Sequence, residues 1–330
     1  MSALDLSICI TTLNRGALFA ETLETILPQL TSSCELVVVD GGSTDETEAI
    51  VTRLAARDPR VHYHRQSENG GVDRDYAAAV EYSRGRYCWL FTDDDLMLPG
   101  ALDAVLRAMA SNPALVLVNA DVWNVDFTRC CDPNRLRMSE DRRYEVGEDD
   151  RFLADTGRYL TFIGGVVVRR DVWDAREKER YFGSLFIHVG VLFQAPLPAH
   201  VEVIAKPGIR IRYGNAGWTP RAFEIWMFKW PDLVWSMPRA AEAKARVTAR
   251  EPWRNPLMLG VHRACGSYSV TEYDRWLRPR ARGLARLMAA LIARIPFRPF
   301  NALLRFAGVI FGLSHRTTGV DLRNAIRRRR

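Results

Sequence analysis

Residues 87–100 read YCWLFTDDDLMLPG, and this stretch combines the signals that decide the fold class. The uninterrupted apolar run 87–91 is typical of a strand that is buried on both faces. Three consecutive aspartates follow it, and a Pro-Gly pair then precedes a segment in which apolar residues recur at helical spacing. We therefore predict a buried strand that ends in an acidic loop and is followed by a helix.

Strand and helix patterns alternate in the same way through the first 120 residues. Short apolar runs predict strands at 6–10, 36–39, 61–64, 87–92 and 114–118. Helical spacing predicts helices at 16–27, 43–57, 72–84 and 99–111. Alternation at this spacing favours an α/β fold in which helices flank a mostly parallel sheet.

The pattern changes after Asp121. The charge-rich segment 128–151 predicts a long surface loop, and shorter elements follow: strands at 162–168, 201–205 and 209–213 and a helix at 184–194. The tryptophan-rich segment 219–238 is expected to pack within the protein, with a sugar-binding surface as the alternative.

Charge is distributed unevenly along the chain. From Arg275 onward the chain has 14 arginines and one acidic residue, a net charge of +13. Because the whole chain has a net charge of +7, residues 1–274 have a net charge of −6. A uniformly basic nucleic-acid-binding domain therefore describes this chain poorly, and we expect no nucleic-acid partner. Scattered cysteines without a CxxC pair, and a start without a signal region, predict a cytoplasmic protein.

The three aspartates of the opening stretch, Asp93, Asp94 and Asp95, are expected near Asp40. Ligands of open parallel sheets bind beyond the carboxyl ends of the strands, where both groups would lie. Clustered carboxylates raise one another's pKa unless a cation compensates their charge, and Mg²⁺ or Mn²⁺ prefers oxygen ligands. We predict an incomplete metal site that a diphosphate completes; the alternative is a solvated turn that caps a helix.

A second motif, VVVDGGSTDET, occupies residues 37–47. Its two glycines permit a tight turn from strand to helix, and Ser43 with Glu46 predicts a capping box at the start of the helix. The motif is neither a P-loop nor GxGxxG. Asp40 at the strand end can accept hydrogen bonds from a nucleoside; a plain capped turn is the alternative.

Four motifs occur in one order: TTLNR (11–15), DGGSTD (40–45), ENGG (68–71) and TDDDLMLPG (92–100). Together they resemble the family 2 glycosyltransferases of the GT-A fold, a Rossmann-like α/β fold. The resemblance covers residues 5–125 well and 126–240 loosely. It implies a catalytic domain at 1–240, with a nucleotide-binding half (1–125) and an acceptor half (126–240), followed by a helical, basic extension at 241–330.

The resemblance also implies site residues. The donor would be a nucleotide diphosphate sugar, UDP being the family's commonest nucleotide, and Asp40 would contact its base. The acidic cluster would contact the ribose and hold Mn²⁺ or Mg²⁺ against the phosphates, with Asp95 the first candidate ligand and Asp93 and Asp94 the others. Further residues are implied to line the nucleotide or diphosphate site: Thr11, Asn14, Arg15, Gly42, Gly71 and Arg74.

The acceptor side departs from the family pattern. Relatives have an acidic motif about 80 to 100 residues after the metal motif, whereas residues 181–190 contain no carboxylate. His188 is one candidate for the general base, Asp155 and Glu224 are others, and a retaining mechanism without such a base stays open. Arg212 is expected to neutralise phosphate and Trp218 to stack on a sugar; otherwise they form a glycine-rich turn with a buried tryptophan.

The C-terminal segment has apolar residues at helical spacing from Leu284 onward, with arginines between them. We expect amphipathic helices on an anionic membrane surface, assisted by the cluster Arg327–Arg330. The alternative is packing on the catalytic domain or on a second protomer in a homo-oligomer. The resulting hypothesis is a metal-dependent glycosyltransferase on the inner face of the cell membrane that extends a glycan or polyprenyl-linked acceptor. A sugar-phosphate nucleotidyltransferase and a non-catalytic scaffold are the alternatives.

Overall fold

The computed structural model describes residues 4–310 and 317–327. Their contacts divide the chain into two compact units, each built from several segments. The first unit comprises residues 1–122, 133–211 and 237–247, and the second comprises 123–132, 212–236 and 248–330. The domain boundary expected at residue 240 stays a prediction.

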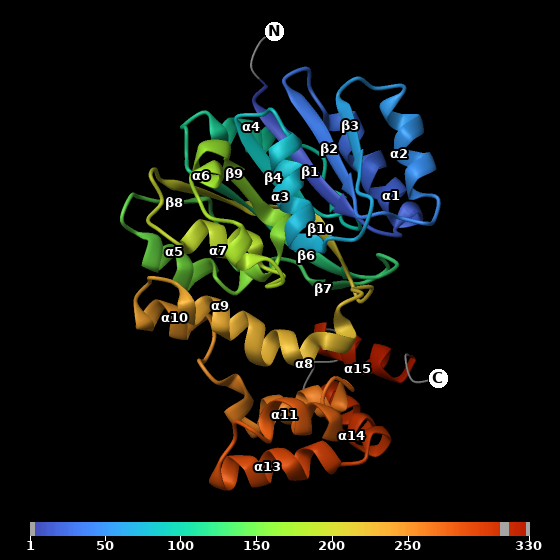
Figure 1. The fold of residues 1–330 in the computed structure, drawn as a ribbon, viewed down its shortest axis with the longest axis vertical. Coiled ribbons are helices and arrows are strands. Elements are labelled where there is room, and N and C mark those ends of the chain that lie inside the picture. Colours follow the sequence, from blue (N-terminus) through green and yellow to red (C-terminus); the bar gives the residue numbers. More distant parts are fainter. Residues whose placement is uncertain (1–3, 311–316, 328–330) are drawn as a thin grey trace. The chain divides into compact units, whose positions relative to one another are not determined.

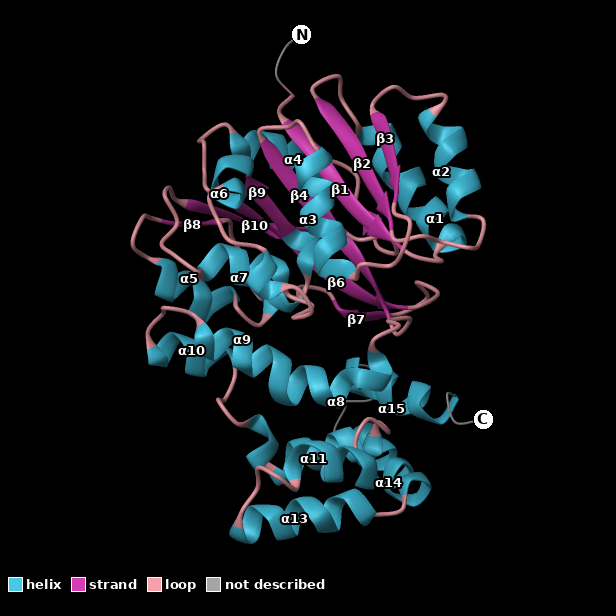
Figure 2. Cartoon of the chain, in the orientation of Figure 1, coloured by secondary structure: helices cyan, strands magenta, loops and turns pink. Residues whose placement is uncertain are grey.

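The first unit is built on a mixed sheet, which Figure 2 shows in magenta. The strand order is β3-β2-β1-β4-β9-β6-β10-β5, and β7 and β8 pair with β6 and β10. The strands are β1 (Leu6–Thr12), β2 (Cys34–Asp40), β3 (Val61–Arg65), β4 (Tyr87–Phe91), β5 (Leu96–Met97), β6 (Leu115–Asn124), β7 (Cys130–Asp132), β8 (Arg142–Tyr144), β9 (Val166–Arg169) and β10 (Val201–Tyr213).

The β3-β2-β1-β4 part of the sheet is parallel, whereas the pairs β4–β9, β6–β9, β10–β5 and β10–β8 are antiparallel. Strand β1 pairs in parallel with β2 and β4, and β2 pairs in parallel with β3. Strand β9 is antiparallel to both of its neighbours, β4 and β6. Every residue of β1, β2 and β4 is buried, as the continuous apolar runs in the sequence predict. The predicted α/β fold is confirmed.

Helices cover the sheet of the first unit. Helix α3 packs on β1 and β2 and crosses one face of the parallel half, while α1 contacts α2 and β5 (Figure 1). The helices are α1 (Gly16–Ile26), α2 (Thr47–Ala55), α3 (Val72–Tyr82), α4 (Ala101–Met109), α5 (Asp149–Thr156), α6 (Arg170–Asp174), α7 (Ile187–Phe193) and α10 (Ala241–Val247).

The structure corrects two details of the sequence interpretation. Ser43 does not cap α2: the helix begins at Thr47, and the Ser43 hydroxyl accepts a hydrogen bond from the Asn14 amide over 2.8 Å instead. Segment 128–151 is not one long loop, because it contains β7, β8 and the start of α5. Both differences arise from long-range pairing, which local patterns do not report.

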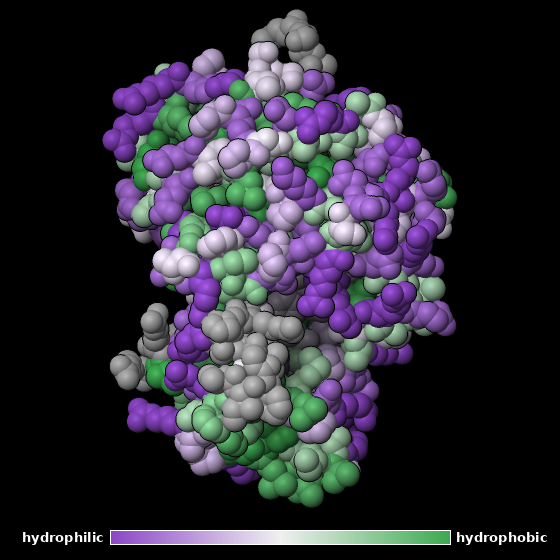
Figure 3. Space-filling model, turned by 180° about the vertical axis from the view of Figure 1, so that it is seen from behind, coloured by the Kyte–Doolittle hydropathy of each residue, from purple (hydrophilic) through white to green (hydrophobic). Residues whose placement is uncertain are grey.

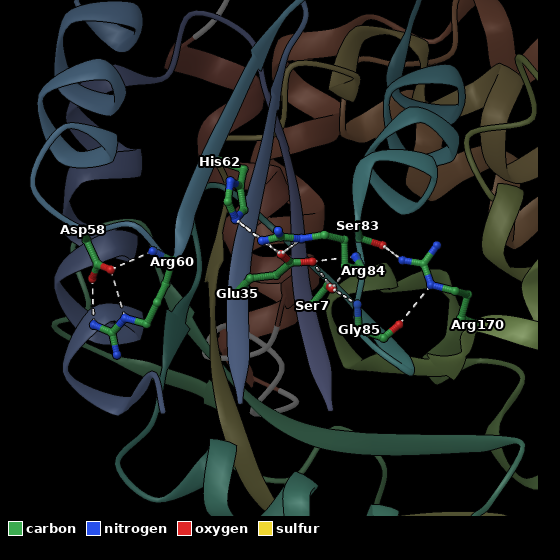
Figure 4. Close-up of polar contacts among 9 residues, drawn as sticks. All are labelled: Ser7, Glu35, Asp58, Arg60, His62, Ser83, Arg84, Gly85 and Arg170. Carbon is green, nitrogen blue, oxygen red and sulfur yellow. Dashed lines mark hydrogen bonds and ion pairs between the residues drawn. The ribbon is translucent and has the colours of Figure 1, made fainter. Parts of the chain in front are cut away.

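A buried polar network fixes the edge of the parallel strands where the chain enters them (Figure 4). The Glu35 carboxylate, in a residue 1% exposed, accepts hydrogen bonds from the Ser7 hydroxyl over 2.7 Å and from Arg84 Nη2 over 2.6 Å. These bonds lower the pKa of Glu35 against the opposing effect of burial, which is the larger single influence. Glu35 is therefore a buried charge that is paired within the fold. This network lies near the starts of the parallel strands, whereas the acidic loop follows the end of β4.

The second unit is mainly helical, and it also includes the short strand β7 and the last residues of β6 and β10. Its helices are α8 (Ala222–Glu224), α9 (Trp230–Ser236), α11 (Pro256–Ala264), α12 (Val270–Glu272), α13 (Gly283–Arg294), α14 (Phe297–Ile310) and α15 (Thr317–Arg327), with π-helical turns at 225–229 and 273–277. Its core joins aromatic residues of the tryptophan-rich segment to the later helices; Phe223, for example, stacks on Tyr268 with ring centroids 4.5 Å apart. Packing within the protein is thus confirmed for most of that segment.

The C-terminal helices present large apolar side chains to the exterior. Helix α13 buries its small face, Ala289, Ile292 and Ala293, and leaves Leu284 73% and Leu291 54% exposed. Figure 3 shows hydrophobic surface gathered over α11, α13 and α14. We define the apolar face of the second unit by the exposed large apolar residues of these helices: Leu257, Met258, Val261, Leu284, Leu287, Met288, Leu291, Leu303 and Phe306.

No single helix among the described residues has the length and apolarity to cross a membrane. Helices α13 and α14 meet the length and composition criteria only as a pair, Gly283–Arg294 with Phe297–Gly308, which is bent by 97°. Of the expected basic cluster, Arg328, Arg329 and Arg330 lie outside the described residues.

Candidate active site

Three loops of the first unit meet at the carboxyl ends of its parallel strands. The register pairs Thr12 with Asp40 and Ile10 with Phe91, so β1, β2 and β4 end at one edge of the sheet. The loops that follow carry the TTLNR, DGGSTD and TDDD motifs. Asp40 and the three aspartates therefore follow strands that end at one edge of the sheet, as the strand pattern of the sequence predicts.

The loop after β1 is hydrogen-bonded to the loop after β2. Asn14 adopts a positive φ of 53°, its amide donates to Ser43 Oγ, and its side-chain Oδ1 accepts from the Thr44 amide over 2.7 Å. The Gly16 amide donates to Asp45 Oδ2 over 3.0 Å. Asn14, which was predicted to line the nucleotide pocket, therefore holds the two loops together in this structure.

An ion pair joins the loop after β1 to the acidic loop. Arg15 Nη1 lies 3.4 Å from Asp94 Oδ2, and both side chains are partly exposed. Burial, and secondly the charge of Asp94, raise the pKa of Asp93 to about 7, while Arg15 opposes the shift. The neighbouring carboxylate of Asp94 thus opposes the ionisation of Asp93.

Asp95 is the most buried of the three aspartates, at 3% exposed, and accepts a hydrogen bond from the Thr92 hydroxyl. Among residues 4–310 and 317–327, no three His, Cys, Asp or Glu side chains converge as a metal site. The donor set that the loop offers consists of carboxylate oxygens, the type that Mg²⁺ and Mn²⁺ prefer. The residues present therefore fit a hard dication that takes its remaining ligands from a substrate and water.

Asp40 is fully buried, and both of its carboxylate oxygens have protein partners. Oδ1 accepts from the Ser43 amide over 2.7 Å, and Oδ2 accepts from the Tyr63 hydroxyl over 2.6 Å. Burial, and secondly this bond, raise the pKa of the Tyr63 hydroxyl well above its usual value. Sequence reasoning missed Tyr63, which lies on β3 and contributes to the site only through strand pairing.

The remaining predicted nucleotide-site residues lie in or beside the same loops. Thr11 is 8% exposed within β1. Gly42 has a φ of +88°, and a Cβ there would stand 3.4 Å from the Gln66 carbonyl. Gly71, with a φ of +89°, precedes α3, and Arg74 in the first turn of α3 lies over the Phe182 ring at 4.5 Å.

Sequence reasoning also missed Asp75, on the first turns of α3. The residue is 6% exposed, and its Oδ2 lies 3.2 Å from where a Cβ on Gly41 would stand. Burial, and secondly the charge of Asp40, raise the pKa of Asp75 to about 6. The available signal in the sequence was an acidic residue four positions after Gly71, the glycine that precedes α3. An acidic residue near a helix N-terminus is also common for a structural reason, because its charge interacts favourably with the helix dipole.

His188 lies in the core of the first unit. The residue is 1% exposed, its Nε2 bonds the Leu160 carbonyl oxygen over 2.8 Å, and its Nδ1 has no hydrogen-bond partner among the described residues. Burial lowers the pKa of His188 to about 4. This is the environment of a neutral core histidine, the alternative to a base that faces solvent.

Asp155 and Glu224, the other predicted bases, belong to different units. Asp155 accepts from Tyr144 Oη over 3.0 Å and pairs with Arg142 at 3.2 Å, which ties α5 to β8. Glu224 pairs with Arg221 at 3.0 Å, and this hydrogen-bonded pair lowers the pKa of Glu224.

Arg212 and Trp218 belong to the second unit. The Arg212 guanidinium is 4.2 Å from the Phe127 ring centroid and donates to the Val125 carbonyl oxygen over 2.9 Å. Trp218 is 42% exposed and meets Trp226 edge to face at 5.7 Å. The exposed indole fits a stacking surface better than the alternative of a buried turn anchor.

Sequence comparison finds a match to the family described as glycosyl transferase family 2 over residues 7–173. A relative from Salmonella typhimurium, the abequosyltransferase RfbV, is 26% identical over 220 residues, which are 63% of this chain and 63% of that protein. The chain thus spans somewhat less than two thirds of the length of this relative.

Structure comparison finds the same fold in solved transferases. TarS of S. aureus (residues 1–349) matches with a TM-score of 0.60 at 14% identity, covering 98% of this chain and 89% of that one; TarS has also been solved with UDP. The mannosyltransferase PcManGT from Pyrobaculum calidifontis, in complex with GDP-Man and Mn²⁺, matches with a TM-score of 0.55 at 16% identity, covering 99% and 87%.

Proposed function

Since the chain belongs to glycosyl transferase family 2, we propose that it transfers a sugar from a nucleotide diphosphate sugar to a hydroxyl group of a glycan or lipid-linked acceptor. In this reaction a glycosidic bond forms between the acceptor oxygen and the anomeric carbon. The bond from that carbon to the phosphate oxygen breaks, the nucleoside diphosphate leaves, and the hydroxyl proton passes to a base.

The observation that supports this proposal most strongly is the meeting of the three motif loops at one sheet edge. The loop after β4 supplies Asp93, Asp94 and Asp95, and the loop after β1 supplies Arg15 within 3.4 Å of Asp94. An arginine beside a loop of three aspartates suits an anionic ligand that binds together with a cation, as a nucleoside diphosphate does. Partners such as UDP and GDP-Man in the solved transferases support this donor class.

We propose that Asp95, with Asp93 or Asp94, holds Mn²⁺ or Mg²⁺ when the donor is bound. Such an ion supplies charge stabilisation to the leaving diphosphate. The raised pKa of Asp93 supports this assignment, because a dication would favour the ionised form of this carboxyl group. The Mn²⁺ complex of PcManGT supports the choice of ion.

The base that takes the acceptor proton needs a side chain within reach of the substrate. His188 is buried and neutral, so Asp155 and Glu224, whose side chains are 19% and 18% exposed, are the stronger of the three candidates. We propose Trp218, with its exposed indole, as an aromatic contact for a sugar ring.

The apolar face of the second unit supports attachment to an anionic membrane surface. Leu284, Leu291 and Phe306 are each more than half exposed, and arginines lie exposed along the same helices, at Arg282, Arg286, Arg294, Arg298 and Arg305. Apolar side chains flanked by basic residues suit the boundary between lipid headgroups and acyl chains. We propose that the protein sits peripherally on the inner face of the cell membrane, where a polyprenyl-linked acceptor is displayed.

The proposed function can be tested with the full chain, a panel of nucleotide sugars, Mn²⁺ and a lipid-extracted acceptor pool. Release of nucleoside diphosphate together with acceptor-dependent incorporation of the sugar is expected. Asp95→Asn should reduce both at least about 100-fold. Asp103→Asn, at an exposed acid on the first turn of α4, is the matched control and should retain activity. Release of pyrophosphate from a nucleoside triphosphate and a sugar phosphate would instead identify a nucleotidyltransferase.

A further inference from the structure

Asp75 is a buried carboxyl group without a hydrogen-bond partner for its side chain among the described residues. It is 6% exposed, while Asp73, one helical half-turn earlier, accepts from the Leu185 amide over 2.8 Å and from the Ile187 amide over 3.1 Å. Asp73 thus anchors the start of α7. Asp75 makes no comparable hydrogen bond among the described residues, so the protein itself does not compensate the burial of this residue.

The Asp75 carboxylate is located beside the turn that follows β2. Its Oδ2 lies 3.2 Å from the Cβ position of Gly41, and that same position lies 3.7 Å from the Thr12 carbonyl oxygen and from Leu13 Cδ1. Its Oδ1 lies 3.8 Å from the Cβ position of Gly70. Two glycines thus leave room for this carboxylate at the sheet edge where the three motif loops meet.

Asp40, the residue expected to contact the nucleobase, is already committed to the protein. The Ser43 amide and the Tyr63 hydroxyl each occupy one of its carboxylate oxygens, and the residue is 0% exposed. Asp40 therefore shapes the turn after β2, while the neighbouring carboxylate of Asp75 retains its full capacity to accept hydrogen bonds from a ligand.

We propose that Asp75 accepts a hydrogen bond from a ring N–H of the donor's nucleobase, and that it thereby determines which nucleotide is bound. This inference rests on the proposed function. Uracil, thymine and guanine present a ring N–H on the Watson–Crick edge, whereas cytosine and adenine present a ring nitrogen acceptor there. An ionised carboxylate attracts the first group and repels the second.

Calorimetric titration of the full chain with UDP, dTDP, GDP, CDP and ADP, at pH 8 with Mn²⁺, tests this assignment. The ligand that binds most tightly should be UDP, dTDP or GDP, with an affinity about tenfold or more higher than that of CDP or ADP. Asp75→Asn should weaken that ligand about tenfold and change CDP and ADP binding by less than about threefold, so that the preference is lost. Asp75→Glu should restore part of it, and Asp73→Asn should keep the preference even if stability falls.

The outcomes separate the inference from the proposed function. Tight binding without base preference, a preference for CDP or ADP, or a preference that survives in Asp75→Asn would overturn the role of Asp75 and leave the transferase proposal standing. Absence of binding by every diphosphate in the presence of Mn²⁺ would overturn the proposed function, and the inference with it.

Discussion

The guanidinium of Arg15 lies 3.4 Å from the carboxylate of Asp94, and this ion pair joins the loops that follow two neighbouring strands, β1 and β4. Both side chains are partly exposed, so the pair contributes little to the stability of the fold. Its greater consequence is electrostatic: a fixed positive charge stands beside an acidic loop at the edge where the donor diphosphate is proposed to bind.

Arg15→Ala should weaken the binding of a nucleoside diphosphate in the presence of Mn²⁺ by about tenfold, because a charge-assisted contact to phosphate is lost. Arg15→Lys keeps the charge without the planar fork and should recover part of the affinity. Calorimetry measures both, with thermal unfolding as the check on folding. Unchanged affinity in Arg15→Ala would mean that this side chain pairs with Asp94 and does not contact the ligand.

Asp75→Asn should stabilise the ligand-free protein at high pH. The folded-state pKa of Asp75 is raised to about 6, above the value near 3.9 of an unfolded chain. The folded protein therefore favours the neutral form of Asp75. Its stability is not reduced by this residue below about pH 4, and it falls as the pH rises through 6 and the buried carboxyl group ionises. At pH 8 the amide removes the penalty of a buried charge, so Tm should rise by about 2–4 °C.

The same Tm difference should shrink toward zero at pH 4, where Asp75 is neutral in both states. Thermal unfolding of both proteins across this pH range measures it, with Asp73→Asn as the control because its carboxylate is hydrogen-bonded to two amides. A lower Tm for Asp75→Asn at pH 8 would show that the Asp75 carboxylate supports the fold.

His188→Gln should lower stability and spare turnover. The glutamine amide can still donate to the Leu160 carbonyl oxygen, but the imidazole is buried and its replacement should destabilise the protein by about 1–2 kcal/mol. Turnover should change by less than about threefold, whereas the loss of a general base reduces it about 10²–10⁴-fold. Asp155→Asn and Glu224→Gln belong in the same assay, since the base is expected to be one of these two.

Replacement of Leu284, Leu291 and Phe306 by glutamine should weaken binding to anionic vesicles at least about tenfold, because each of these side chains would bury apolar area in the lipid. Co-sedimentation with phosphatidylglycerol vesicles measures it, and Val146→Gln, at an apolar residue 64% exposed in the first unit, is the control. Unchanged sedimentation, combined with a wild-type dimer that the triple variant loses, would show that a second protomer covers this face.

The sequence predicted the parallel half of the fold because the relevant signals are local. A continuous apolar run such as 87–91 is expected to form a strand that is buried on both faces. The first charged residues after such a run then indicate where the strand ends. The same reasoning predicted where Asp40 and the three aspartates lie, since parallel strands end at a common edge.

The partners of these residues could not be predicted in the same way. Tyr63 reaches Asp40 only because β3 pairs with β2, and Asp75 approaches Gly41 only because α3 crosses that part of the sheet. The local sequence around Ser43 matches a helix-capping pattern. In the structure, however, the Ser43 hydroxyl accepts a hydrogen bond from the Asn14 amide and does not cap the helix. Each of these contacts joins segments about 20 or more residues apart, which a local pattern does not report.

The proposed transferase activity depends on the acidic loop after β4 binding a dication together with a donor diphosphate. Isothermal titration of the wild-type chain with the preferred nucleoside diphosphate, in Mn²⁺ and in EDTA, measures this dependence. Binding that requires Mn²⁺ and falls at least about tenfold in both Asp93→Asn and Asp95→Asn is the predicted result. Equal affinity in EDTA, or full Mn²⁺-dependent affinity in both variants, would contradict it.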